Sequence, residues 1–197
     1  MASVPRAVWK AREVVLQMLR DRGHVRISLH PFRTYAEVRH LKDYGLLRIE
    51  AESGGGRRVR VDFCGPVKLG VKGIRQRAEQ AIEAGIDMLV FVYQFVITNP
   101  AQREMQKLAC EVEAFNVRDL QFNVTRHTLN PAFRAMSHDE KIRVLTSRKW
   151  ALKDLPRMLV SDPVARYFAF KPGTLVEIRG GTVEGGEAVS YRVVVPV

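Results

Sequence analysis

Five histidines, two cysteines and a few acidic side chains are the groups in this sequence that could bind a metal or carry out catalysis. The histidines are His24, His30, His40, His127 and His138. None of them lies in an HExxH motif or in a Cys/His ligand spacing, and Cys64 and Cys110 form no CxxC pair. We therefore expect structural roles for the histidines and two buried thiols in a reducing compartment.

Two further segments approach the pattern of an enzyme without completing it. The segment GPVKLGVKG has glycines and lysines but lacks the GxxxxGKS/T order of a phosphate-binding loop. Asp62, on an expected strand, is a candidate Mg²⁺ ligand, but no acidic-x-Lys follows on the next strand. Asp139-Glu140-Lys141 falls instead on the capping turn of an expected helix. The sequence thus predicts no catalytic residue, metal, cofactor or small-molecule substrate, and a metal-dependent nuclease is kept as the alternative enzyme.

The charge balance indicates an acidic partner. Lys and Arg number 32 against 21 Asp and Glu, a net charge of +11, which suits either nucleic acid or an acidic protein surface. A free-standing basic DNA-binding protein is a second alternative, but neither a recognition helix nor a platform of stacking aromatic side chains is evident. Arg57, Arg58 and Arg60 form either a local electrostatic patch or, by default, a solvated strand face.

Length and hydrophobic content favour a folded protein without a membrane anchor. A chain of 197 residues with 46% hydrophobic composition can bury one or two ordinary cores. The start, MASVPRAVWK, has no apolar signal core. The longest apolar run, Met88–Tyr93, is far shorter than the ~20 residues of a membrane span and reads as a buried strand.

Residues 1–129 are expected to form one α/β domain with a mixed sheet. VPRAVWKAREVVLQMLRDRG has a helical stripe that Gly23 ends, and LLRIEAE and RRVRVDFC alternate as a hairpin around residues 53–56. VKGIRQRAEQAIEAG reads as a helix, MLVFVYQFVI as a strand, NPAQREMQKLACEVEAF as a helix and LQFNVT as a strand. The strand–helix–strand order predicts a crossover connection.

Residues 130–197 are expected to form a small α+β domain. Ser137 and Glu140 make a capping box, and Ser161 or Asp162 caps a short helix with Pro163 in its first turn. The turn at 171–173 relies on Gly173, and a strand over 174–179 precedes a glycine-rich hairpin into AVSYRVVVPV. Such a small unit is expected to need another protein to cover part of its apolar surface.

Long segments of this chain resemble the shared fifth subunit of eukaryotic nuclear RNA polymerases and its archaeal counterpart. The C-terminal segments are LPRM at 155–158, DPVARYFAFKPGTLVEI at 162–178 and SYR at 190–192. Upstream, the resemblance continues through VWKAREVVLQMLRDRG, VDFCGPVKLGVKGI, FVYQFVITNPA, NVTRHTLNPAF and SHDEKIRVL. Collinear motifs of this length are far more specific than a short pattern. The N-terminal domain favours the eukaryotic form, since the archaeal protein resembles only the C-terminal part.

The resemblance implies a non-catalytic nuclear subunit that contacts the largest subunit, other polymerase subunits and the backbone of downstream duplex DNA. The C-terminal domain would dock on the largest subunit, and the N-terminal domain would form part of the lower jaw. The mixed-sheet pattern of the N-terminal domain itself resembles a restriction-endonuclease core, which is why a nuclease is kept as an alternative. Whether this copy serves every nuclear polymerase or only one is left open. The expected assembly residues are Arg157, Asp162, Pro163, Arg166, Tyr167, Lys171, Gly173 and Arg192.

Among these residues, we expect Asp162 and Pro163 to cap a helix and Gly173 to permit a turn. Tyr167 and Phe168 are expected in the core, and of the two Tyr167 is the one expected to present its hydroxyl outward. Arg166 and Arg192 contact either a partner or only solvent. Near DNA, the resemblance implies a loop of Thr98, Asn99, Pro100, Ala101, Gln102 and Arg103. The family pattern there is Thr-Pro-Ser-Ala, so this loop departs from it. A helix start beside an Arg can still receive a phosphate, while Thr98 or Asn99 can equally serve only as a cap.

Overall fold

The computed structural model describes residues 6–28, 32, 34–126, 131–181 and 187–196. The chain divides into two compact units, Met1–Phe122 and Asn123–Val197, which are described one at a time. The boundary expected at 129/130 lies within residues 127–130, outside the described residues. In the described chain, no helix is long and apolar enough to cross a membrane.

The N-terminal unit is built on a five-stranded mixed sheet with the order β1-β2-β3-β4-β5. The strands are β1 (His24–Ser28), β2 (Ile49–Ser53), β3 (Arg58–Phe63), β4 (Met88–Tyr93) and β5 (Glu111–Asn116). The first three pair antiparallel, whereas β3, β4 and β5 pair parallel. The predicted hairpin is confirmed as β2–β3, and its turn places Gly56 at φ +81°, a conformation that glycine adopts without strain.

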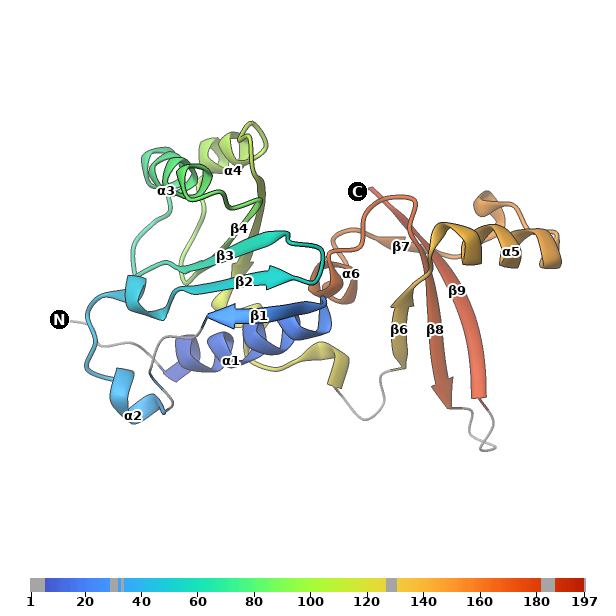
Figure 1. The fold of residues 1–197 in the computed structure, drawn as a ribbon, viewed down its shortest axis with the longest axis horizontal. Helices are drawn as coiled ribbons and strands as arrows, with labels where there is room; N and C mark the ends of the chain where they lie inside the picture. Colours follow the sequence, from blue (N-terminus) through green and yellow to red (C-terminus); the bar gives the residue numbers. More distant parts are fainter. Residues whose placement is uncertain (1–5, 29–31, 33, 127–130, 182–186, 197) are drawn as a thin grey trace. The chain divides into compact units, whose positions relative to one another are not determined.

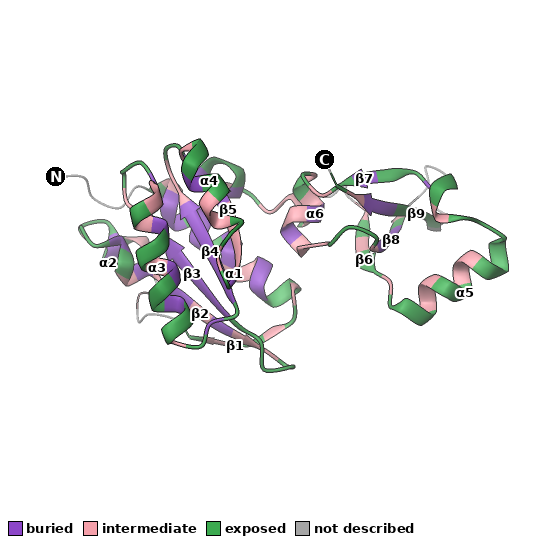
Figure 2. Ribbon diagram, turned by 90° about the horizontal axis from the view of Figure 1, so that it is seen from above, coloured by how far each residue is buried: buried purple, intermediate pink, exposed green. Residues whose placement is uncertain are grey.

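Helices cover both faces of this sheet (Figure 1). α1 (Arg6–Asp21) lies on one face, and the crossover helices α3 (Val71–Glu83) and α4 (Asn99–Met105) lie on the other. Short elements complete the unit: α2 (Tyr35–Val38), and the 3-10 turns η1 (Tyr44–Leu47) and η2 (Val117–Leu120). Alternate side chains of β4 enter different cores, with Leu89 and Phe91 in the cluster under α3 and α4. Of the five strands, β3 and β4 are the most buried (Figure 2).

Part of the predicted order was wrong. The helix expected over 99–115 ends at Met105, and EVEAFN forms strand β5 beside β4. The strand expected over 120–125 is absent, because η2 and η3 (Val124–Arg126) occupy that region. The segment EVEAFN contains helix-forming residues. As strand β5, however, it pairs with the outer edge of β4 and satisfies the β4 backbone groups that would stay unpaired if EVEAFN continued helix α4.

Strand β1 was not predicted. Its side chains are exposed or half-buried, and Val25 is 71% exposed, so the sequence carries no alternation of buried and exposed residues there. Leu47, expected on a strand, lies instead in η1 and is fully buried. Both differences come from pairing and packing with distant residues, which local pattern does not report.

The C-terminal unit holds a second sheet, with the order β6-β8-β9-β7. Its strands are β6 (Ala132–Ala135), β7 (Arg157–Leu159), β8 (Leu175–Gly181) and β9 (Glu187–Val195). Its helices are α5 (His138–Arg148), η4 (Leu152–Asp154) and α6 (Pro163–Phe168). Neighbouring β8 residues belong to two different clusters, Leu175 with Leu155 and Val193, and Val176 with Met158 and Ala165. Each face of this sheet therefore has a small core of its own.

The predicted local motifs of this unit are confirmed. The Ser137 hydroxyl accepts from the Glu140 backbone while the Glu140 carboxylate accepts from the Ser137 backbone. These bonds, with one from Arg134, lower the pKa of Glu140 to about 2. Asp162 Oδ1 accepts from the backbone N–H groups of Val164 and Ala165. Of the predicted hairpin glycines, Gly180 and Gly181 pair with β9, whereas Gly185 and Gly186 lie outside the described residues.

Ala169 ends α6 in the left-handed conformation, at φ +55°. The N–H groups of Ala169 and Phe170 bond to the carbonyls of Arg166 and Ala165 at 3.2 and 2.9 Å, so this position is fixed by the helix end. A residue with a Cβ is strained there by roughly 1 kcal/mol relative to glycine.

We predict that Ala169→Gly stabilises the protein by about 0.5–1 kcal/mol, because glycine adopts this conformation without the steric cost. Thermal or urea unfolding measures the difference. Ala165→Gly, within the same helix, is the matched control and should destabilise. Equal losses from both variants would contradict the assignment of Ala169 as a strained cap.

Candidate functional site

Asp62, the one residue considered as a metal ligand on a strand, is held by arginines. It is buried on β3, and its Oδ1 accepts from Arg48 Nε at 2.7 Å. Its Oδ2 lies 4.0 Å from Arg77 Nε on α3. The two guanidinium groups balance the buried charge, although Oδ2 itself accepts no hydrogen bond among the described residues. The geometry is that of a structural ion pair.

The arginines of the predicted basic hairpin are also engaged within the chain. Arg60 is buried, donates from Nε to Glu50 at 2.9 Å, and reaches the Gln80 carbonyl of α3 at 3.3 Å. Arg58 Nη1 donates to the Ala84 carbonyl at 2.6 Å. Arg57 forms an ion pair with Glu111. These side chains therefore support the fold and are not the electrostatic patch that was one of the two interpretations.

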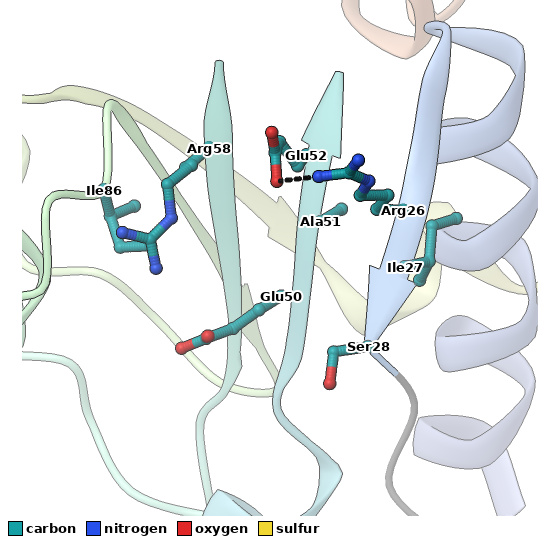
Figure 3. Close-up of a pocket in the computed structure, with 8 residues that line it drawn as sticks. All are labelled: Arg26, Ile27, Ser28, Glu50, Ala51, Glu52, Arg58 and Ile86. Carbon is teal, nitrogen blue, oxygen red and sulfur yellow. Dashed lines mark ion pairs between the residues drawn. The ribbon is translucent and has the colours of Figure 1, made fainter. Parts of the chain in front are cut away.

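Arg58, Arg60 and Asp62 alternate along β3 and meet successive turns of α3 and its C-terminal end. We call these side chains and their partners the β3–α3 seam. Beyond the seam, the same face of β1 and β2 carries opposite charges in register, and Arg26 pairs with Glu52 at 3.6 Å. These groups line a hollow of about 360 Å³ whose wall includes Arg58 and Ile86. Figure 3 shows the side chains that line it. Because its charges are already paired, this hollow offers no set of free groups that could carry out a reaction.

The remaining candidates for reactive chemistry are dispersed. No three His, Cys, Asp or Glu side chains gather in a metal-binding arrangement within the part of the chain that the structure describes. Cys64 and Cys110 are both buried and free, as expected. Burial raises the pKa of the Cys64 thiol to about 11 and also raises that of Cys110. At neutral pH both are therefore protonated and poor nucleophiles.

The loop expected near DNA is brought together at the start of α4. Thr98 occupies the N-cap position, but its hydroxyl makes no capping bond, while its carbonyl accepts from Gln102 at 3.0 Å. Ala101 is fully buried. The exposed members of the loop are Asn99, Pro100, Gln102 and Arg103. Arg103 is the one formal positive charge among residues 98–103, and it lies within the short helix α4.

Several expected assembly residues have structural tasks. Asp162 caps α6, Pro163 begins it, and Gly173 adopts φ +83° with its N–H bonded to the Val194 carbonyl. Tyr167 is buried, and its hydroxyl accepts from Asn123 Nδ2 at 2.8 Å. The expected core position of Tyr167 is confirmed, but its hydroxyl is bonded by Asn123 within the unit and does not face outward.

The cations of the expected assembly set do not form one patch. Arg157 pairs in register with Val193, whereas Arg192 pairs with Val176. Directly paired residues share a face, so Arg157 and Arg192 lie on opposite faces of the sheet, and both are exposed. Lys171 is exposed on the turn before β8, and Arg166 is half-buried on α6.

An exposed aromatic group was missed from the sequence. Arg148 Cζ lies over the rings of Trp150 and Tyr191, and the two ring centroids are 6.1 Å apart in an edge-to-face arrangement. Trp150 is 37% exposed, although tryptophan is usually well covered. The signal available in the sequence was RKW at the end of a predicted helix, a cation and an aromatic just beyond a helix end.

Comparison with known proteins gives concordant matches. Residues 122–194 match the family described as RNA polymerase Rpb5, C-terminal domain. The chain is 33% identical over 195 residues to DNA-directed RNA polymerase V subunit 5A of Arabidopsis thaliana, covering 93% of this chain and 86% of that protein. It is 28% identical over 201 residues to DNA-directed RNA polymerases I, II, and III subunit RPABC1 of Caenorhabditis elegans, covering 95% of each.

We predict that Asp62→Ala lowers the stability of the protein by about 1–3 kcal/mol, because it leaves Arg48 and Arg77 without their carboxylate. Urea unfolding measures the loss. Asp119→Ala, at an exposed position in η2, is the control and should change stability far less. Cleavage of duplex DNA by the parent protein with Mg²⁺, abolished in Asp62→Ala, would instead show that Asp62 is catalytic.

Proposed function

Because the chain belongs to the Rpb5 family of DNA-directed RNA polymerase subunits, we propose that its C-terminal unit docks on the largest subunit of a nuclear polymerase. The protein is a non-catalytic polymerase subunit. Its relatives are named as subunits of polymerase V, of polymerases IV and V, and of polymerases I, II and III. We place this chain in the nucleus, in one or more of these complexes.

The observation that carries the proposal is the agreement between the family match and a self-contained unit. The match spans residues 122–194, and the compact unit spans Asn123–Val197. This unit is small, and its described surface exposes large apolar side chains: Ile142, Trp150, Leu159 and Val189. Apolar surface that a small domain leaves uncovered is typical of a chain that is completed by association.

We also propose that the N-terminal unit lies near downstream duplex DNA as part of the lower jaw. The arginines of the β3–α3 seam are committed within the fold, so the contact falls to exposed cations such as Arg103 in the 98–103 loop. Backbone contacts of this kind position a duplex without reading its sequence. We also propose that the mixed sheet with helices on both faces is the restriction-endonuclease-like core expected from the sequence pattern.

The docking proposal predicts that the C-terminal unit alone is sufficient for binding to the polymerase and that the N-terminal unit alone is not. A tagged fragment Asn123–Val197 should co-purify with the largest polymerase subunit, whereas Met1–Phe122 should not. In the full chain, Arg192→Glu should weaken incorporation, since a charge left unpaired in a desolvated interface costs about 2–5 kcal/mol. Immunoblotting of the largest subunit after affinity purification measures both effects.

A folding control accompanies this test. Gly173→Val forces a side chain into φ +83° and should lower the unfolding midpoint, which shows how a fold defect affects incorporation. Circular dichroism establishes that each fragment and Arg192→Glu are folded. If the folded N-terminal fragment recovers the largest subunit and the folded C-terminal fragment does not, docking by the C-terminal unit is wrong.

The jaw proposal predicts weak, sequence-independent binding of the isolated chain to duplex DNA, with steep loss on adding salt. Arg103→Gln should reduce the slope of log K against log salt by about one, because one phosphate contact is lost. Arg143→Gln, an equal loss of charge on the C-terminal unit, should leave the slope nearly unchanged. Fluorescence anisotropy over a salt series measures the slopes, and equal effects of the two variants would contradict a contact at Arg103.

A further inference from the structure

The end of α5 builds a rigid cation–aromatic group on the surface of the C-terminal unit. Lys149 adopts φ +55°, and the backbone N–H of Trp150 donates back to the Leu145 carbonyl at 3.0 Å. This reversal of the chain directs Trp150 toward Tyr191 on β9. The carbon Cζ of Arg148 then lies 4.9 Å from the Trp150 ring centroid and 5.8 Å from that of Tyr191.

The guanidinium of Arg148 has donors to spare. Among the described residues it donates to no carboxylate or carbonyl, and its contacts are with the two rings. The two rings attract the cation through their π faces, and neither ring supplies the oxygen acceptors that guanidinium N–H groups prefer. A guanidinium held in this way is preorganised for bidentate binding of a carboxylate.

We propose that Arg148, Trp150 and Tyr191 anchor a docking surface that takes an acidic segment of another polymerase subunit, with an Asp or Glu of that segment bound at the edge of Arg148. The proposal rests on the assembly function above and names the surface that carries it. This surface does not include Arg192, because Arg192 lies on the opposite face of β9 from Tyr191 and Val193.

Charge complementarity determines the kind of partner. Residues 148–157, RKWALKDLPR, contain four cations and one carboxylate. That carboxylate, Asp154, accepts from the Ala151 N–H at 3.1 Å. Elsewhere in the unit, Glu140 is bound by Arg134, and Glu177 by Arg134 and Arg179. None of these three carboxylates pairs with Arg148, Lys149, Lys153 or Arg157, and we infer that the docking partner supplies the matching carboxylates.

The apolar part of the surface fits the same conclusion. Trp150 is 37% exposed, and Val189, on the same side of β9 as Tyr191, is 43% exposed. Helix α5 has no buried residue along its length (Figure 2). Tryptophan, tyrosine and arginine are the residues that most often dominate interface energy, and here all three are in mutual contact at an exposed edge.

A purely structural task is the competing explanation, since the same contacts could simply fix the end of α5. The two explanations differ in what mutation changes. A structural cluster affects the unfolding midpoint, whereas a docking anchor affects incorporation into the polymerase in a chain that remains folded.

The test uses the full-length tagged chain, expressed in cells that contain its polymerase. The variants are Arg148→Glu and Trp150→Ala, and Arg143→Glu on the exposed side of α5 is the matched charge control. We expect the largest subunit recovered per tagged chain to fall at least about tenfold in Arg148→Glu and Trp150→Ala, with little change in Arg143→Glu. Arg148→Lys, which keeps the charge but lacks the planar fork, should give an intermediate recovery.

Thermal unfolding of each purified variant, and anisotropy with duplex DNA, separate the possible outcomes. Loss of recovery with an unchanged unfolding midpoint supports the proposal. The proposal is overturned if Arg148→Glu recovers the largest subunit fully, or if Arg143→Glu loses as much recovery as Arg148→Glu. It is also overturned if recovery falls only as far as the unfolding midpoint falls, or if DNA binding is lost while recovery of the largest subunit stays normal. If the parent chain itself recovers no polymerase, the assembly function fails and this inference fails with it; recovery by the parent and by Arg148→Glu alike refutes this inference alone.

Discussion

The N-terminal unit depends on charged side chains buried between β3 and α3. Arg60 and Asp62 are almost inaccessible to solvent, and a buried charge is tolerated only where hydrogen-bonded partners surround it. Those partners come from β2, from the turn before it and from α3 with its C-terminal end. The seam therefore requires the hairpin, the crossover helix and the sheet register at once, and a shift of β3 by one residue would place every charge on the wrong face.

The same constraint limits what this unit can do. An arginine already bound to a carbonyl and a carboxylate has few donors left for a phosphate, so the basic hairpin contributes to stability and little to recognition. The excess positive charge that remains available lies on loops and helix ends, including Arg103 and the 148–157 segment. Net charge alone does not distinguish these two groups of cations, because it counts a buried, paired arginine and an exposed, unpaired one equally.

The C-terminal unit shows a different balance. Its four strands separate two small cores, so each face needs its own cover, from α6 on one side and from the α5–η4 segment on the other. Cover is incomplete at the edges, where Trp150, Leu159 and Val189 are exposed. A unit of this size buries only a modest fraction of its surface on folding, so some apolar and cationic side chains remain exposed and available for association.

The sequence by itself determined the features that depend on neighbours within a few residues. These are the capping box at Ser137, the cap at Asp162, the positive φ of Gly173, the amphipathic α1 and the β2–β3 hairpin, and each is stabilised by groups close in the chain. The family resemblance likewise followed from long collinear motifs. Only the tertiary structure decided the rest: that EVEAFN is a strand, that Asp62 pairs with arginines, that Tyr167 bonds Asn123, and that Arg157 and Arg192 lie on opposite faces. The partners in those cases are mostly far apart in the chain, and a local pattern carries no information about which distant group will satisfy a strand edge, a buried charge or a hydroxyl.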